Sequence, residues 1–275
     1  MKFTFTAVML ATAFTVGCAQ ENERWMPFQN KIGVALGIGS MTYLDKNASP
    51  LVYTTKPKNV RLFYNLETTN FLFSVDVDFK IGSTVAKYHR DRTLLFYEQD
   101  YKGKNEEKKF PVGGSLMAAR ISLGGFYKLS SSSNTRVALG GKVMNELFYP
   151  QGWTTPGLFN ALSLSPEVLV QQRLDDRNSL TAHARVPLVT WLTRLNYDNT
   201  VSAPNSTQLR SFFKNSEWVT ANRFVSPAVG IDYNYHINNK WGAGLSYEFV
   251  WYSITTPQPM KGVSQSLLAN IYRQF

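Results

Sequence analysis

A pair of carboxylates is the feature of this sequence with the clearest chemical potential. Asp76 and Asp78 stand two residues apart in a run of alternating apolar and polar residues, so both side chains lie on one face of an expected strand. Two neighbouring carboxylates shift each other's pKa and can serve as acid and base. Asp232 and His236 are four residues apart on one strand face and are not adjacent, so they add no catalytic partnership. The sequence therefore predicts no catalytic residues.

Other reactive groups are scarce. The chain has 3 His and 1 Cys, whereas a zinc site needs clustered His or Cys together with carboxylates. Serine is too common to single out a nucleophile beside His183. We therefore predict no metal site and no cofactor.

The composition excludes several classes of protein. The 275 residues include 29 Lys and Arg against 19 Asp and Glu, a net charge of +10, and 44% are hydrophobic. This apolar content argues against disorder, and the single Cys18 excludes a disulfide scaffold. Beyond the N-terminal segment no apolar run reaches about 18 residues, which excludes a helical membrane protein. The basic run 102–109 (KGKNEEKK) has no interleaved aromatic residue, so nucleic acid is not a predicted partner.

The N-terminus has the layout of an export signal. Residues 1–19 place Lys2 before an apolar stretch and end in small residues before Gln20, which is typical of a cleaved secretory signal peptide. Its removal leaves a mature chain, 20–275, with a charge of 10 − 1 = +9. The run 15–18 (TVGC) keeps a second interpretation open, in which Cys18 is lipidated.

The mature chain alternates apolar and polar residues almost throughout, which predicts strands rather than amphipathic helices. Short polar turns lie at 66–70, 130–134, 175–178 and 238–239. Long segments lie at about 44–58, 82–113, 148–160, 194–223 and 254–263. Short connections on one side and long ones on the other are typical of a transmembrane β-barrel. The expected strands cover 32–39, 60–65, 73–80, 117–124, 137–144, 161–174, 179–193, 224–237, 240–254 and 264–275.

The predicted fold is a single domain, 20–275, forming a closed antiparallel transmembrane β-barrel of ten strands. Residues 93–97 (TLLFY) lie inside a long segment and fit a hairpin outside the membrane; if they crossed it, the barrel would have twelve strands. Trp241 and Trp251 share one face, and ten residues at about 3.3 Å with a tilt of about 40° separate them by roughly 25 Å, the height of an apolar band. Tyr233 and Tyr235 would join Trp241 in the aromatic girdle at its end. A soluble β-sandwich is the alternative.

The last residues alternate as Leu267, Ala269 and Ile271 and finish in Phe275. This segment resembles the terminal strand of bacterial outer-membrane β-barrel proteins, although Arg273 stands where an apolar or aromatic residue is usual. The resemblance implies location in the outer membrane of a Gram-negative-type bacterium, contact with its lipid and lipopolysaccharide, and recognition of Phe275 by the barrel-assembly machinery. It implies no activity.

The face opposite the apolar one should line the lumen and carries charges of both signs in balance. Unpaired charge would be costly there, so we predict a salt-bridged network that fills the interior. Its predicted members are Arg61, Asp76, Asp78, Arg120, Lys142, Glu146, Glu167, Arg173, His183, Arg185, Asp232, His236 and Glu248.

Three prolines, Pro166, Pro187 and Pro227, fall in consecutive strands, and we place all three on the lipid-facing side. Because proline cannot donate to a ladder, they could weaken one strip of the wall and form a lateral gap. Local bending of the strands is the alternative.

Three classes of function stay open. The favoured one is an outer-membrane barrel in a structural or accessory role, without enzymatic activity. The second is a narrow channel, or a lateral passage for lipid or small apolar solutes. The third is an outer-membrane enzyme, a protease or lipid-modifying; proteases of the omptin type use an acidic pair with an Asp–His partnership, and Asp232 and His236 match that layout poorly.

Overall fold

The computed structural model describes residues 30–89, 93–99, 101–111, 113–131, 134–151, 157–194, 207–214 and 216–275. The predicted signal peptide 1–19, with Cys18, lies outside these residues. Among the described residues, no helix is long and apolar enough to cross a bilayer. The elements are β1 (Lys31–Asp45), β2 (Val52–Thr55), β3 (Lys58–Glu67), β4 (Phe71–Ala86), β5 (Thr93–Gln99), β6 (Asn105–Pro111), β7 (Gly113–Ser131), β8 (Thr135–Gln151), β9 (Phe159–Arg173), β10 (Asn178–Arg185), β11 (Val189–Arg194), α2 (Gln208–Phe213), β12 (Glu217–Thr220), β13 (Phe224–Val225), β14 (Ala228–His236), β15 (Trp241–Ile254) and β16 (Met260–Gln274).

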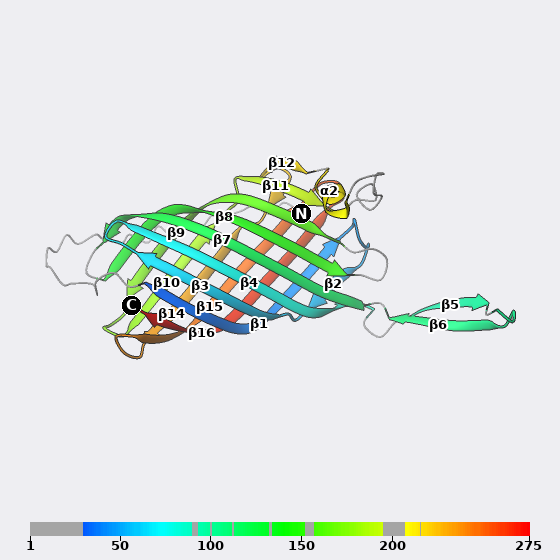
Figure 1. The fold of residues 1–275 in the computed structure, drawn as a ribbon, viewed down its shortest axis with the longest axis horizontal. Coiled ribbons are helices and arrows are strands. Elements are labelled where there is room, and N and C mark those ends of the chain that lie inside the picture. Colours follow the sequence, from blue (N-terminus) through cyan, green and yellow to red (C-terminus); the bar gives the residue numbers. More distant parts are fainter. Residues whose placement is uncertain are drawn as a thin grey trace, which may run out of the picture.

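Ten strands form a closed hydrogen-bonded ring (Figure 1). The order around it is β1, β3, β4, β7, β8, β9, β10, β14, β15 and β16, and β16 pairs again with β1. Neighbours in the ring are antiparallel. At the closing seam the backbone N–H of Asn30 donates to the carbonyl of Phe275 at 3.1 Å. The predicted all-β, ten-stranded antiparallel barrel is therefore confirmed.

The connections distinguish the two ends of the barrel. Short turns at 68–70, 174–177 and 237–240 lie at one end together with Asn30 and Phe275, and we call this the turn end. The longer connections lie at the opposite, loop end. Strands β5 and β6 pair with each other in a separate two-stranded sheet, which projects beyond the loop end in Figure 1. Residues 93–97 are therefore not part of the ring, and the barrel has ten strands rather than twelve.

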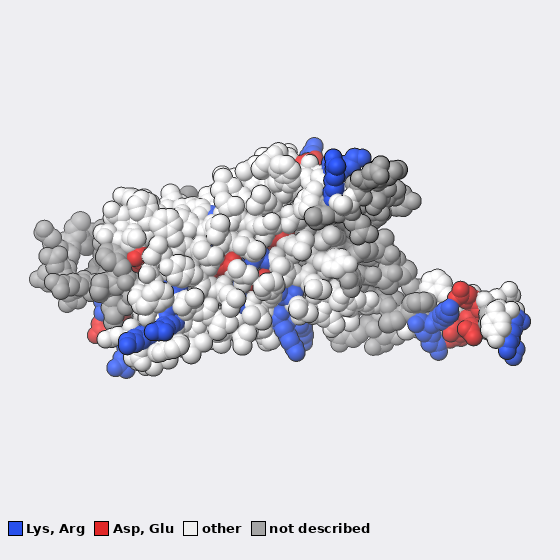
Figure 2. Space-filling model, viewed as in Figure 1, with Lys and Arg blue, Asp and Glu red and all other residues white. Residues whose placement is uncertain are grey.

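The outer face of the ring is apolar, as the alternation predicts. Trp241 is 45% exposed and Trp251 is 40% exposed, so neither is buried against a second sheet, and the sandwich alternative is wrong. In Figure 2 most of the barrel surface is white; a few charged atoms show between the two ends, and larger groups of charged residues lie at the ends and on the β5–β6 hairpin. Further outward side chains include Ile32, Leu36, Leu62, Val75, Ile121, Leu139, Leu164, Val229, Leu245 and Ile271.

The polarity of both faces reverses along the barrel. On β16 the exposed face carries Ile271 and Leu267 toward the turn end but Gln265 and Lys261 toward the loop end. Inside the loop end a large group of buried side chains is apolar, because a wall that meets water outside needs a hydrophobic core within. We call this group the apolar core: Met41, Tyr43, Tyr53, Ala86, Leu116, Phe148, Phe159, Ala161, Leu192, Val219, Phe224, Ala228, Val250, Tyr252, Ile254 and Met260.

The wall around the prolines is mostly paired. The Val186 N–H donates to the Pro166 carbonyl at 3.3 Å, and the Trp251 N–H donates to the Pro227 carbonyl at 3.1 Å. The ladder is interrupted at one place, between the β10–β14 and β11–β12 pairings, where Arg185 is the last residue of β10 to pair with β14. The unpaired part of the wall is therefore a short interruption and does not extend as a strip across three strands.

The structure contradicts the predicted placement of Pro187 on the lipid-facing side. It is buried, whereas Pro166 and Pro227 are partly exposed. The reason is the period of two in a strand: Pro187 is two residues from lumen-facing Arg185, and Val186 and Leu188 take the outward positions instead. The three prolines thus do not share the lipid-facing side.

One glycine is required by the close approach of two strands. A Cβ at Gly140 would lie 2.0 Å from the carbonyl oxygen of Gly125 on the neighbouring strand, whereas a Cβ at Gly125 would meet only Phe73 carbons at 3.8 Å or more. We expect Gly140→Val to destabilise the barrel by about 3 kcal/mol or more. Gly125→Val is the control and should refold as wild type. Urea unfolding and heat-dependent gel mobility measure both, and equal behaviour of the two variants would contradict the packing.

The turn after β9 is held by one carboxylate. Asp175 Oδ1 accepts the backbone N–H of Arg177 and of Asn178, each at 2.8 Å. These donors, that of Arg177 foremost, hold the pKa of Asp175 below its usual range. The contribution of the turn to stability is then present above the ordinary carboxyl pKa and is lost as the pH falls through the lowered one.

We expect an NMR titration of the refolded protein to give Asp175 a pKa below about 3.9. Asn178→Ala removes the side-chain amide that also donates to Asp175, at 2.8 Å, so it should move the pKa upward. A value at or above the ordinary one in the wild-type protein would show that the turn is not formed.

Candidate functional site

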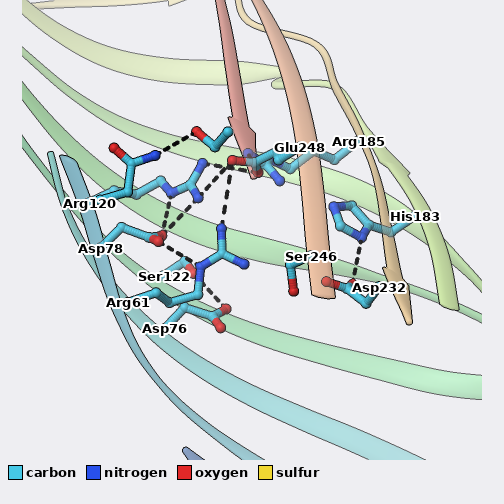
Figure 3. Close-up of polar contacts among 12 residues, drawn as sticks. Arg61, Asp76, Asp78, Arg120, Ser122, His183, Arg185, Asp232, Ser246 and Glu248 are labelled. Atoms are coloured by element: carbon cyan, nitrogen blue, oxygen red, sulfur yellow. Dashed lines mark hydrogen bonds and ion pairs between the residues drawn. The ribbon is translucent and has the colours of Figure 1, made fainter. Parts of the chain in front are cut away.

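Five charged side chains from five strands meet inside the barrel, and we call them the central network (Figure 3). Asp78 accepts from Arg61 Nε at 2.6 Å and from Arg120 Nη2 at 2.8 Å. Glu248 accepts from Arg120 Nη2 at 3.0 Å and from Arg185 Nη2 at 2.9 Å. Arg120 thus joins both carboxylates, and the network links β3, β4, β7, β10 and β15.

The central network satisfies charges that the lumen cannot solvate freely. Its carboxylates are buried, and each of them accepts hydrogen bonds from two guanidinium groups. Arginine suits this role because its planar fork can serve two carboxylates at once. Removing one partner would leave a buried charge uncompensated. The network therefore braces strands from opposite parts of the ring.

A second group lies beside the central network. Ser122 Oγ donates to Asp76 Oδ2 at 3.1 Å, and Lys142 Nζ lies 3.8 Å from Asp76 and 3.3 Å from Glu167. Glu167 is 1% exposed, and its carboxylate has no hydrogen-bond partner among the described residues. Asp76 and Asp78 are therefore brought to one face, as predicted, but each is bound by its own set of donors.

Asp232 contacts a histidine of the neighbouring strand, not His236, which stands four residues further along its own strand. His183 Nδ1 on β10 lies 3.5 Å from Asp232 Oδ2 on β14. The His183 ring covers Gly230, where a Cβ would be 2.4 Å from Nε2, so a larger residue would displace it. His236 instead lies toward the turn end, with Gln274 Nε2 at 2.6 Å from its Nδ1. Spacing along the chain could not reveal a partner on a neighbouring strand.

Two other predicted lumen residues take local partners. Glu146 accepts from the Tyr252 hydroxyl at 2.7 Å, where the polar interior meets the apolar core. Arg173 pairs with Asp176 of the following turn, so it belongs to the rim of the turn end rather than to the interior network.

Sequence reasoning missed a buried ion pair at the loop end. Arg194 contacts Asp45 and donates to the carbonyl of Thr256 at 3.0 Å, which fastens the end of β1 to the 255–259 connection. Both residues fall at the edge of long segments, where alternation has ended, so no pattern marked them as interior.

A cavity of about 210 Å³ occupies the lumen on the turn-end side of the central network, and we call it the cup. Arg61, Arg120 and Glu248 contribute to its closed end. Lys31, Glu67 and Lys128, at the strand ends beside the short turns, line its mouth. The side of the network toward the loop end is filled by the apolar core. Among the described residues, the lumen thus has a cavity toward the turn end and an apolar filling toward the loop end.

No family model matches the chain, and no curated protein matches it. Among solved structures, the outer membrane protease OmpT from Escherichia coli is similar over 94% of this chain and 100% of its own, with 10% identity and a TM-score of 0.53. An outer membrane channel from Pseudomonas putida F1 is similar over 94% of this chain and 99% of its own, with 10% identity and a lower TM-score of 0.42. The chain thus has the fold of a bacterial outer-membrane β-barrel.

The central network gives a direct stability prediction. Glu248→Gln keeps the shape of the side chain but removes the charge between Arg120 and Arg185, so we expect a loss of about 3–5 kcal/mol in the free energy of unfolding. Denaturant unfolding in detergent micelles measures it. Glu98→Gln is the control, because its pair with Lys108 is exposed and its loss should leave stability unchanged. A Glu248→Gln variant as stable as wild type would contradict the bracing role.

Proposed function

We propose that this chain is an integral outer-membrane protein with a sealed barrel, in a structural or accessory role rather than as a pore. Export would use residues 1–19 as a cleaved signal peptide. Support comes from the ring of ten strands, the apolar outer face and the fold shared with OmpT.

The observation that carries this proposal is the filling of the lumen. The central network crosses the barrel, and the apolar core occupies the loop end beyond it. Barrels of about eight strands are filled by side chains, and open aqueous channels belong to those of sixteen or more. Ten strands filled in this way leave no continuous water path for ions.

The proposed partners are the outer-membrane lipid with its lipopolysaccharide and, during assembly, the barrel-assembly machinery. Lipid would contact the outward apolar band, which has Trp241 and Trp251 on its β15 face. The machinery would recognise β16, whose outward side chains include Leu267, Ile271 and Phe275.

The alternative functions have weaker support. A lateral passage needs an open strip of wall, but the interruption is short, and Ala228, which pairs with Arg185 at its edge, is buried. A protease role, the activity named for OmpT, needs an acidic pair free to act, and Asp76 and Asp78 are engaged by Ser122 and two arginines. Both are outcomes that experiments on the purified protein would reveal.

Planar-bilayer recording tests the sealed barrel. We expect the refolded mature chain to insert without steady ohmic current, because the central network and apolar core block the lumen. A refolded porin in the same membrane serves as the positive control. Reproducible single-channel openings that scale with the amount of inserted protein would contradict the proposal and favour the narrow channel.

A further inference from the structure

The mouth of the cup concentrates positive charge. Lys128 Nζ lies 2.8 Å from Glu67 Oε1, and Arg136 contacts the same oxygen. Lys31 also lines this mouth, and its Nζ lies over the Tyr272 ring at 5.2 Å from the centroid. Glu67 is thus the carboxylate that Lys128 and Arg136 share, whereas Lys31 has no ion-pair partner among the described residues. Their surroundings therefore favour a further negative group.

Beside this mouth lies a smaller recess of about 60 Å³, which shares Lys31, Glu67 and Arg136 with the cup. Ser179 lines it, is 4% exposed, and its Oγ has no hydrogen-bond partner among the described residues. A buried hydroxyl without a hydrogen-bond partner lowers stability, so an acceptor bound in the recess would be favoured. The remaining lining residues are Gln171, Arg173, Asp175, Asp176, Asn178 and His236.

The carboxylates that line the recess already have partners within the protein. Asp175 accepts the N–H groups of its own turn. The Asp176 side chain is 92% exposed and pairs with Arg173, so its charge is screened by water. Glu67 is divided between Lys128 and Arg136. The unmatched charge therefore stays with the ammonium group of Lys31, which lines the same recess as Ser179.

The volume of the recess limits what it can hold. About 60 Å³ has room for a few water-sized groups, and so for one oxyanion group. The adjoining cup, about 210 Å³, could take the rest of a small molecule. Lysine and arginine with a hydroxyl donor suit a phosphate or carboxylate group.

We propose that the recess formed by Lys31, Arg136 and Ser179 binds the phosphate or carboxylate group of a small soluble molecule that reaches the cup from the turn end. This inference rests on the proposed function only for the side of access. It does not depend on whether the barrel conducts ions.

Titration of the refolded protein in detergent micelles tests the site, with inorganic phosphate in one arm and acetate in the other. Binding is followed by NMR shifts of the Ser179 and Asn178 amides at low ionic strength. We expect saturable binding of at least one anion, weakened by added chloride. Preference for phosphate or for acetate identifies which of the two groups the natural ligand carries.

Two variants separate a built site from general attraction to a basic protein. We expect Lys31→Gln to weaken binding by about tenfold, and this variant leaves no carboxylate without its ion-pair partner. Ser179→Ala should weaken binding several-fold. Lys261→Gln is the matched control, because Lys261 is exposed on the outer wall near the loop end, and it should bind as wild type. Absence of saturable binding of either anion, or equal weakening by Lys31→Gln and Lys261→Gln, would overturn the proposal. Conductance is measured separately, so a failed site and a conducting barrel give different results.

Discussion

A sheet that crosses lipid must satisfy every backbone N–H and C=O within itself, and this constraint governs the whole molecule. Water is absent from the hydrocarbon, so an open edge would leave polar groups unpaired. Pairing of β16 with β1 closes the ring of ten strands. Closure then fixes the side chains, because one face of each strand must meet lipid and the other must face the lumen.

The reversal of polarity along the barrel follows from the same constraint. Where the outer wall is apolar, the interior holds the central network and the polar lining of the cup. Where the strands continue past the apolar band, Lys261 and Gln265 face outward and the interior becomes the apolar core. The polar network and the hydrophobic core therefore fill the lumen in two different ways. The cup lies in its turn-end portion.

The period of two in the sequence is enough to predict the strands, their number and the face of the charges in the central network. It places all five members of the network, Arg61, Asp78, Arg120, Arg185 and Glu248, on the lumen side without knowledge of the strand pairing. Partners could not be predicted, because pairing depends on which strands become neighbours and on their register. His183 meets Asp232 across a strand pair, and Arg194 meets Asp45 where alternation has ended.

Access to the lumen from each side tests the central claim of a barrel closed at one end most directly. Asn234→Cys places one thiol in the cup, and Leu245→Cys places one on the lipid face, in a chain beginning at Gln20 that has no other Cys. In oriented vesicles, a charged, water-soluble thiol reagent should label Asn234→Cys from the turn side alone and Leu245→Cys from neither side. Labelling of Asn234→Cys from the loop side would show that the lumen is open and would contradict the account.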